Sequence, residues 1–167
     1  MSKYFLTFTR TLCVFILVSL VALSNANSSN AIQLTSVVEL EVVSKDEQGN
    51  EIVKRIPAEK VTPGSEVIYT TRFKHNGSQA AEDIVISNPI PEHTVYKVNS
   101  ATGKGTEILY SVDNGQSFHH QDKLAVVEKD GSTRLAEAKD YTDIRWTYRG
   151  QLQPGDEGAV EFRVVLK

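Results

Sequence analysis

The chain has 167 residues, of which 40% are hydrophobic and 23% charged, and its 18 basic and 21 acidic residues give a formal net charge of −3. This length suits one ordinary domain, and the globular composition excludes wholesale disorder and a coiled coil. The slightly acidic balance argues against a nucleic-acid-binding surface. A single cysteine, Cys13, excludes an internal disulfide and any site built from several cysteines.

The first 26 residues have the three parts of a secretory signal peptide. Lys3 and Arg10 supply positive charge, and an apolar run follows from residue 12 to residue 23. This run is too short to span a membrane as a helix, because twelve residues cover only about 18 Å of a ~30 Å hydrocarbon core. Small residues then precede a cleavage site between Ala26 and Asn27. We therefore expect a secreted or periplasmic protein that meets a membrane only through the uncleaved signal.

Cys13 lies at the start of the apolar run, whereas a lipoprotein cysteine follows such a run, so we do not expect a lipoprotein. Loss of the signal leaves 16 basic residues, 21 acidic residues and no cysteine. A short polar stretch at residues 27–35 then leads into a single domain over residues 36–167. Without a disulfide, that domain must be stabilised by its core alone, which is more usual in bacterial envelopes than in small animal extracellular domains.

The chain after residue 31 shows short β-rich runs separated by Gly, Pro, Asn and Asp, with no sustained helical period. This pattern predicts an all-β, antiparallel sandwich of roughly seven to nine strands, and the absence of long crossover helices excludes a parallel α/β sheet. The expected strands are residues 32–43, 51–56, 66–74, 81–87, 94–98, 106–112, 123–128, 143–148 and 159–166. Residues 135–141 are the only helix-like piece, of about one turn.

Tight turns are expected where Pro fixes φ and where Gly or Asn accepts a left-handed backbone. The residues that form them are Pro63, Gly64, Asn76, Gly77, Asp113, Gly115, Pro154 and Gly155. Tyr69 and Trp146 are expected in or near the core, with the polar atom of each at the margin of a sheet.

A family resemblance rests on three segments in order, which are residues 61–70, residues 75–77 with 81–91, and residues 144–146 with 152–155. The first holds a Pro-Gly turn before a strand with Tyr69, the second an Asn-Gly turn, and the third a further Pro-Gly turn. The chain thereby resembles the DUF11-type repeat domain of bacterial and archaeal surface proteins over residues 36–167, in a single copy. The resemblance implies an immunoglobulin-like sandwich at a cell surface and implies no activity.

Residues 111–118 match the Asp-box pattern S-x-D-x-G-x-[ST]-[FW], which sialidase-like propellers repeat as a structural turn. One copy in a chain too short for a propeller predicts a β-hairpin turn. Asp113 is expected to accept backbone N–H bonds there, Gly115 to be left-handed and Phe118 to pack beneath. A glycan hydrolase is the weaker interpretation of this motif.

His119 and His120 follow the same turn, with Asp122 close by, and His75 and His93 lie elsewhere. Because neighbouring residues on a strand point to opposite faces, the adjacent pair cannot easily share one metal, and solvated loop histidines are expected. No nucleophile, phosphate-loop or H-E-x-x-H motif occurs, and the acidic pairs lack the spacing of a calcium loop. We therefore expect no catalytic residue, no metal site and no cofactor.

The function expected from these observations is that of a non-catalytic module of the bacterial envelope, structural or protein-binding. It would contact an unknown protein partner through an edge strand or a loop face. The alternative is a small carbohydrate-binding module, which needs an exposed aromatic platform. The loop-proximal aromatic residues available for such a platform are Tyr96, Tyr110, Phe118 and Tyr141. A hydrolase is the least favoured function.

The signal peptide gives a first testable prediction. Export should be followed by cleavage after Ala26, because small residues stand at both recognition positions before that bond. N-terminal sequencing of the secreted or periplasmic protein should then begin at Asn27. A membrane-embedded product that retains Met1 would contradict the prediction.

Overall fold

The computed structural model describes residues 31–167, so the expected signal and its cleavage site at Ala26 and Asn27 lie outside the described residues. The described chain is built from eleven strands and two short 3-10 helices, and contains no α-helix. The strands are β1 (Ile32–Lys45), β2 (Glu51–Pro57), β3 (Glu66–His75), β4 (Val85–Pro89), β5 (Thr94–Tyr96), β6 (Thr102–Gly103), β7 (Thr106–Ser111), β8 (Ala125–Val127), β9 (Thr133–Leu135), β10 (Asp143–Tyr148) and β11 (Glu157–Leu166). The helices are η1 (Gln121–Lys123) and η2 (Ala138–Asp140).

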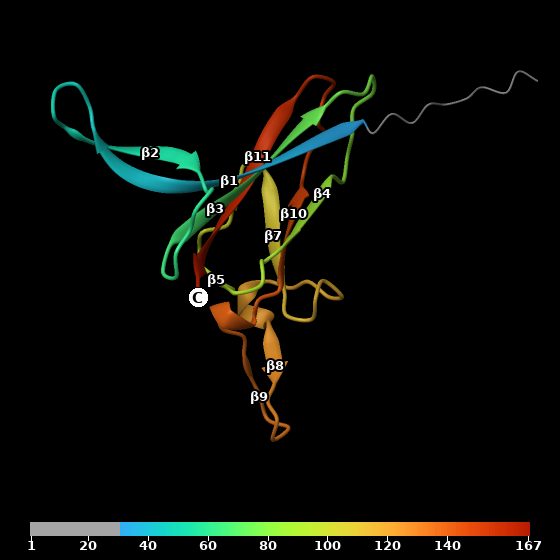
Figure 1. Ribbon diagram of the computed structural model, residues 1–167. Helices are drawn as coiled ribbons and strands as arrows, with labels where there is room; N and C mark the ends of the chain where they lie inside the picture. The colour runs from blue at the N-terminus through green and yellow to red at the C-terminus, as the bar shows by residue number, and fades with distance from the viewer. Residues whose placement is uncertain (1–30) are drawn as a thin grey trace, which may run out of the picture.

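The strands form two packed sheets and a separate hairpin. The larger sheet has the order β2-β1-β3-β11-β5, with β6 also paired to β11, and the smaller sheet has the order β4-β10-β7. β8 and β9 pair only with each other and project away from the sandwich (Figure 1). Every pairing is antiparallel. The expected all-β antiparallel sandwich is thereby confirmed.

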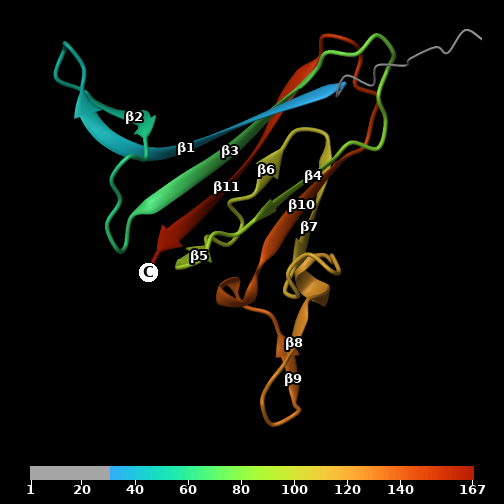
Figure 2. The same cartoon turned by 45° about the vertical axis from the view of Figure 1, so that its right-hand side comes forward.

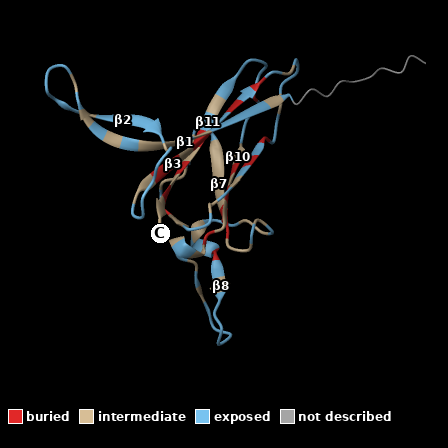
Figure 3. Cartoon of the chain, in the orientation of Figure 1, coloured by how far each residue is buried: buried red, intermediate tan, exposed pale blue. Residues whose placement is uncertain are grey.

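The core lies between the two sheets, and the buried residues are found on the strands that form them (Figure 3). Alternate residues of a strand point to the same face, so every second residue can point inward. On β11, Val160, Phe162 and Val164 are each at most 1% exposed. Trp146 on β10 is 0% exposed, and its ring centroid lies 6.0 Å from that of Phe162 on the opposite sheet. The prediction that Trp146 belongs to the core is confirmed. Tyr69 is only partly buried, stacked at 5.2 Å on Phe162, which matches a near-core position.

The expected margin position of the Trp146 indole nitrogen is wrong. Nε1 is buried and has no hydrogen-bond partner among the described residues. The cause is the packing around the ring, because Gly103 of β6 closes over it. A Cβ added at Gly103 would lie 3.0 Å from Cδ1 of Trp146. Close packing thus holds the indole in place but leaves its Nε1–H donor without a hydrogen bond.

The Asn76–Gly77 segment, where the sequence predicts a tight turn before the next strand, does not join two strands of one sheet. β3 and β4 belong to different sheets, and β4 begins only at Val85, after an Asp83 residue with φ of 51°. Gly77 is required for another reason, since an added Cβ would lie 2.6 Å from Cε1 of His75. The glycine thus allows the close approach of a buried ring rather than a left-handed turn.

The predicted strands and the observed ones differ mainly in the short elements. β6 and β9, of two and three residues, were not expected, because so few residues carry no visible alternation. Leu135 ends β9, and the helix-like piece at 135–141 contains only the single turn η2.

β1 is long because it serves two partners in succession. Residues Ile32–Glu39 pair with β3, whereas Glu39–Lys45 pair with β2. Residues 40–57 form a two-stranded ribbon that curves away from the sandwich, and we call this ribbon the arm (Figures 1 and 2). Val43 and Val53 are directly paired on it and are 67% and 64% exposed.

The buried indole gives a prediction for stability. Trp146→Ala should lower the free energy of unfolding by about 3–5 kcal/mol, because it leaves a large cavity in a close-packed core. Val127→Ala is the control, since Val127 is 74% exposed on the outlying hairpin and should change stability by less than about 0.5 kcal/mol. Urea unfolding followed by circular dichroism measures both, and equal effects would contradict the assigned core.

Candidate functional site

The outer face of the larger sheet, which points away from the smaller sheet, carries an unusual buried residue. Ile68 lies in β3 between the inward residues Val67 and Tyr69, so its side chain points outward, yet it is 0% exposed. Its partners in the neighbouring strands are Glu39 and Arg163. Within residues 31–167 no second sheet covers this face, so the side chains that neighbour Ile68 on the same sheet must shield it from water.

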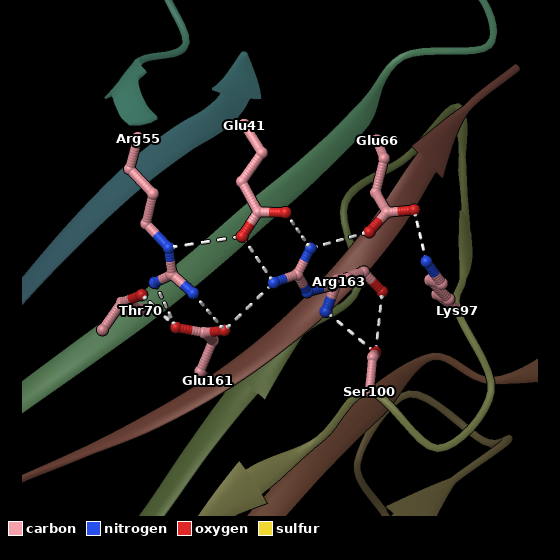
Figure 4. Close-up of polar contacts among 8 residues, drawn as sticks. All are labelled: Glu41, Arg55, Glu66, Thr70, Lys97, Ser100, Glu161 and Arg163. Carbon is pink, nitrogen blue, oxygen red and sulfur yellow. Dashed lines mark hydrogen bonds and ion pairs between the residues drawn. The ribbon is translucent and has the colours of Figure 1, made fainter. Parts of the chain in front are cut away.

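Arg163 lies at the centre of that cover (Figure 4). Its guanidinium donates to both carboxylate oxygens of Glu41, at 2.9 and 2.8 Å, and to Glu66 at 2.9 Å. These contacts join β11 to β1 and β3, and the two-pronged contact to Glu41 fixes orientation as well as distance.

Arg55 of the arm reaches across the sheet to β11. It donates to the two oxygens of Glu161 at 2.6 and 3.1 Å, and its Nε lies 3.5 Å from Glu41. Thr70 also donates to Glu161, at 3.1 Å, and Lys97 contacts Glu66 at 2.5 Å (Figure 4). We call the six charged residues Glu41, Arg55, Glu66, Lys97, Glu161 and Arg163 the ion-pair cluster.

The cluster contains three cations and three carboxylates, so its charges are balanced. Hydrogen bonds from Arg163 hold the pKa of Glu41 below its ordinary value, and a bond from Lys97, followed by one from Arg163, does the same for Glu66. The bonds to Glu41 and Glu66 raise the pKa of Arg163 in turn. Carboxylates held ionised in this way are poor general acids near neutral pH. The arrangement therefore clamps the base of the arm onto the sheet rather than preparing a proton transfer.

The predicted turn at Asp113 is present and its chemistry is internal. Asp113 Oδ1 accepts from the Ser117 backbone N–H at 2.9 Å and Oδ2 from the Ser117 hydroxyl at 2.6 Å. Gly115 has φ of 76°, and His119 forms an antiparallel bridge with Tyr110, which closes the hairpin. A hydrogen bond from the Ser111 hydroxyl, followed by these two bonds from Ser117, lowers the pKa of Asp113 strongly. Both oxygens of the Asp113 carboxylate therefore accept hydrogen bonds within the turn and stabilise it.

The two predicted Pro-Gly turns are found with left-handed glycines, as expected. Gly64, after Pro63, has φ of 87°, and Gly155, after Pro154, has φ of 88°. Their backbone N–H groups bond to Leu166 and His75 respectively, each at 2.8 Å. Both turns therefore tie the ends of the larger sheet together.

The histidines do not gather, and one of them is not a solvated loop residue as expected. His75 is 1% exposed, with Nδ1 3.0 Å from the carbonyl of Ala31 and Nε2 2.5 Å from that of Gln79. Its burial follows from the last inward position of β3. His120 lies 3.4 Å from Glu107, and His119 is bound through its backbone. No group of three potential metal ligands occurs within residues 31–167.

The aromatic residues considered for a carbohydrate platform are wrong for that role. Tyr96, Tyr110 and Tyr141 are 1%, 7% and 8% exposed and pack together with ring centroids 5.3 to 5.6 Å apart. Burial is the main cause of a strongly raised pKa at Tyr110. The guanidinium of Arg145 covers Phe118, 3.5 Å from the ring centroid. These residues were near turns in the sequence, but they point into the core or are capped.

The sequence missed the ion-pair cluster. The signal that could have suggested part of it is the alternation of Glu161 and Arg163 with inward apolar residues on β11. The pairing of Arg55 with Glu161, which are 106 residues apart, has no local signal.

Comparison with known proteins gives no relative. No family model, no curated protein and no solved structure matches the chain. None of the helices in the described part of the chain is long and apolar enough to cross a membrane. The DUF11-type resemblance therefore stays a prediction.

The ion-pair cluster gives a prediction for stability. Arg163→Met should keep the stem that covers Ile68 but lower the free energy of unfolding by about 1–2 kcal/mol, between the values for exposed and buried ion pairs. The control is Lys139→Met, because Lys139 pairs with Glu137 at 2.8 Å, both side chains are more than half exposed, and loss of such a pair should be undetectable. If Arg163→Met lowered the free energy of unfolding no more than the control does, the stabilising role of the ion-pair cluster would be contradicted.

The same variant should depend on pH in a defined direction. Glu41 and Glu66 have lowered pKa values, so their contribution is complete above the ordinary carboxylate pKa near 4.5 and is lost as pH falls through the lower folded-state value. The difference in stability between wild type and Arg163→Met should therefore be larger at pH 7 than at pH 3. Urea unfolding at both pH values measures it, and a constant difference would contradict the role of these carboxylates.

Proposed function

We propose that the protein is an exported, non-catalytic, immunoglobulin-like module of a bacterial envelope, and that its arm binds another protein. The observation that carries the proposal is the exposed pair Val43 and Val53 on a ribbon that projects from the sandwich. Exposed apolar residues grouped on a projecting element mark interaction surfaces more often than scattered ones do. The predicted signal peptide and the DUF11-type resemblance support the envelope location.

The ion-pair cluster supports a binding role for the arm. A two-stranded ribbon alone is only marginally stable in water. Arg55 and Glu41 fix the base of this ribbon through Glu161 and Arg163, so little ordering remains to be done when a partner binds.

The non-catalytic part of the proposal rests on the state of the acidic groups. The carboxylates with displaced pKa values include Glu41, Glu66, Glu107 and Asp113, and all four are displaced downward by Arg, Lys or turn hydrogen bonds. A general acid at neutral pH needs the opposite displacement. Hydrolysis and carbohydrate binding are the weaker alternatives, since the Asp113 turn is internally bonded and the tyrosines are buried.

Site-specific photocrosslinking in producing cells tests the proposal. A photoreactive residue at Val53 should give a discrete adduct with a partner protein, whereas one at Lys54, on the opposite face of the same strand, should give little. Val43→Asp with Val53→Asp should abolish binding without changing the melting temperature, because both side chains are exposed.

Two results would contradict the proposal. The absence of any adduct along the arm would remove the binding role. A measurable turnover that His119→Ala abolished at unchanged melting temperature would remove the non-catalytic one.

A further inference from the structure

The two packed sheets have unequal width, and one strand of the larger sheet has nothing opposite it. Three contacts define which strands face each other across the core: Trp146 with Phe162, Tyr110 with Tyr96, and Asn88 with Thr71. β10 thus faces β11, β7 faces β5, and β4 faces β3. Among the described residues no strand faces β1. The inward side chains of Leu34 and Val38 are consequently 53% and 37% exposed.

Within residues 31–167, two strand edges are free on this same side of the sandwich. Residues 32–37 of β1 pair only with β3, since the chain after β2 first reaches this edge where the Ala58 N–H donates to the Val38 carbonyl, and β4 pairs only with β10. Between the sheets at this opening lies a cavity of about 180 Å³, lined in part by Ser36, Tyr69, Asn88 and Pro91. The smaller sheet therefore has a vacant strand position beside β4 and opposite β1.

The charge pattern of these edges is unusual for surface strands. Residues 32–38 and β4 contain no charged residue, whereas β2, the edge strand further along the same sheet, carries Glu51, Lys54 and Arg55. Exposed edges are normally protected from pairing by charges, by prolines or by a covering element. Here Pro89 removes a single donor at the end of β4. Two uncharged edges can meet without burying a charge.

The two free edges also lie at the same height along the sheet. Asn88 donates to Thr71 at 3.0 Å, and the Thr71 hydroxyl lies 3.1 Å from that of Ser36. Asn88 and Ser36 are thus level. β4 runs back along β3 and therefore in the direction of β1 (Figure 2). With a similar rise per residue, Val85–Pro89 lies level with residues 33–37 of β1, whose edge away from β3 is free.

We propose that two copies of this chain associate at this opening, about a two-fold axis that runs along their β1 strands. The axis preserves height and strand direction, so β1 of each copy lies parallel to β4 of the other and occupies the vacant position in its smaller sheet. The inward faces of the two β1 strands then cover each other, and Leu34 and Val38 become buried. A second copy fits because each copy offers one surplus strand and one vacant position, as a self-complementary two-fold interface requires. This surface is separate from the arm.

Sedimentation and light scattering across concentration test the association. The wild type should change from monomer to dimer between about 1 μM and about 1 mM, the range of weak specific complexes. Leu34→Lys should stay monomeric, because the charge would be buried against the other copy. Val127→Lys, at an even more exposed apolar site on the outlying hairpin, should dimerise like wild type. A wild type that stays monomeric throughout, or a Leu34→Lys variant that dimerises equally well, would overturn the proposal.

Crosslinking then tests the geometry of the dimer. Facing sheets lie about 10 Å apart, beyond the reach of a disulfide but within that of a short bismaleimide. With Cys13→Ser as background, Leu34→Cys should crosslink to its own counterpart and Val127→Cys should not. A dimer in which Leu34→Cys fails to crosslink would place the interface elsewhere and overturn the assignment. Photocrosslinking from Val53 should be unaffected by Leu34→Lys, so the failure of one proposal is distinguishable from the failure of the other.

Discussion

The mismatch in width between the two sheets is the constraint on which the other features of this protein depend. A sandwich excludes water only where both layers are present, and the smaller sheet covers three strand positions while the larger continues beyond it. Trp146 and Phe162 occupy the region of overlap and are completely or almost completely buried. Beyond the overlap, β1 keeps the apolar inward pattern of a core strand without a layer to meet it. Along this side of the described chain, the apolar inward side chains of β1 therefore have no facing strand to pack against.

The outer face of the larger sheet uses charge where the inner face uses packing. Ile68 is as inaccessible as any core residue, although it is covered by long side chains and not by a second sheet. Arg163 is the cross-strand partner of Ile68, and a long side chain can shield a neighbour while its guanidinium is satisfied, here by Glu41 and Glu66. The same contacts stiffen the arm. Coverage of the sheet and orientation of the arm are thus one physical arrangement.

The sequence predicted the strands well and their partners poorly, for physical reasons. Strict alternation from Glu66 to Lys74 identified a strand that is observed at Glu66–His75, because one buried face imposes a period of two. Asn76 and Gly77 suggested a tight turn, yet the glycine makes room for the ring of His75, a requirement that only tertiary structure reveals. The contact between Arg55 and Glu161 depends on the curvature of the arm, which no local pattern encodes.

Three tyrosines that lie near turns in the sequence are buried in the structure. Tyr96, Tyr110 and Tyr141 stand close to turns in the chain, and proximity to a turn suggested exposure. Each instead points inward, and the hydroxyl of Tyr96 lies 3.2 Å from that of Tyr110 and accepts from the backbone of Ala101. Nearness to a loop along the chain therefore says little about which way a side chain points.

The antiparallel ladder of β1, β3 and β11 also determines how the domain responds to a pulling force. β1 begins beside His75, at one end of β3, and β11 ends beside Glu66, at the other end. Tension applied between the start of β1 and the end of β11 would act along the strands and load their hydrogen bonds in shear, so that many must break together. A hairpin pulled open from one end loses its bonds one after another. The ladder therefore resists tension along this line more strongly than it would resist being peeled open from one end.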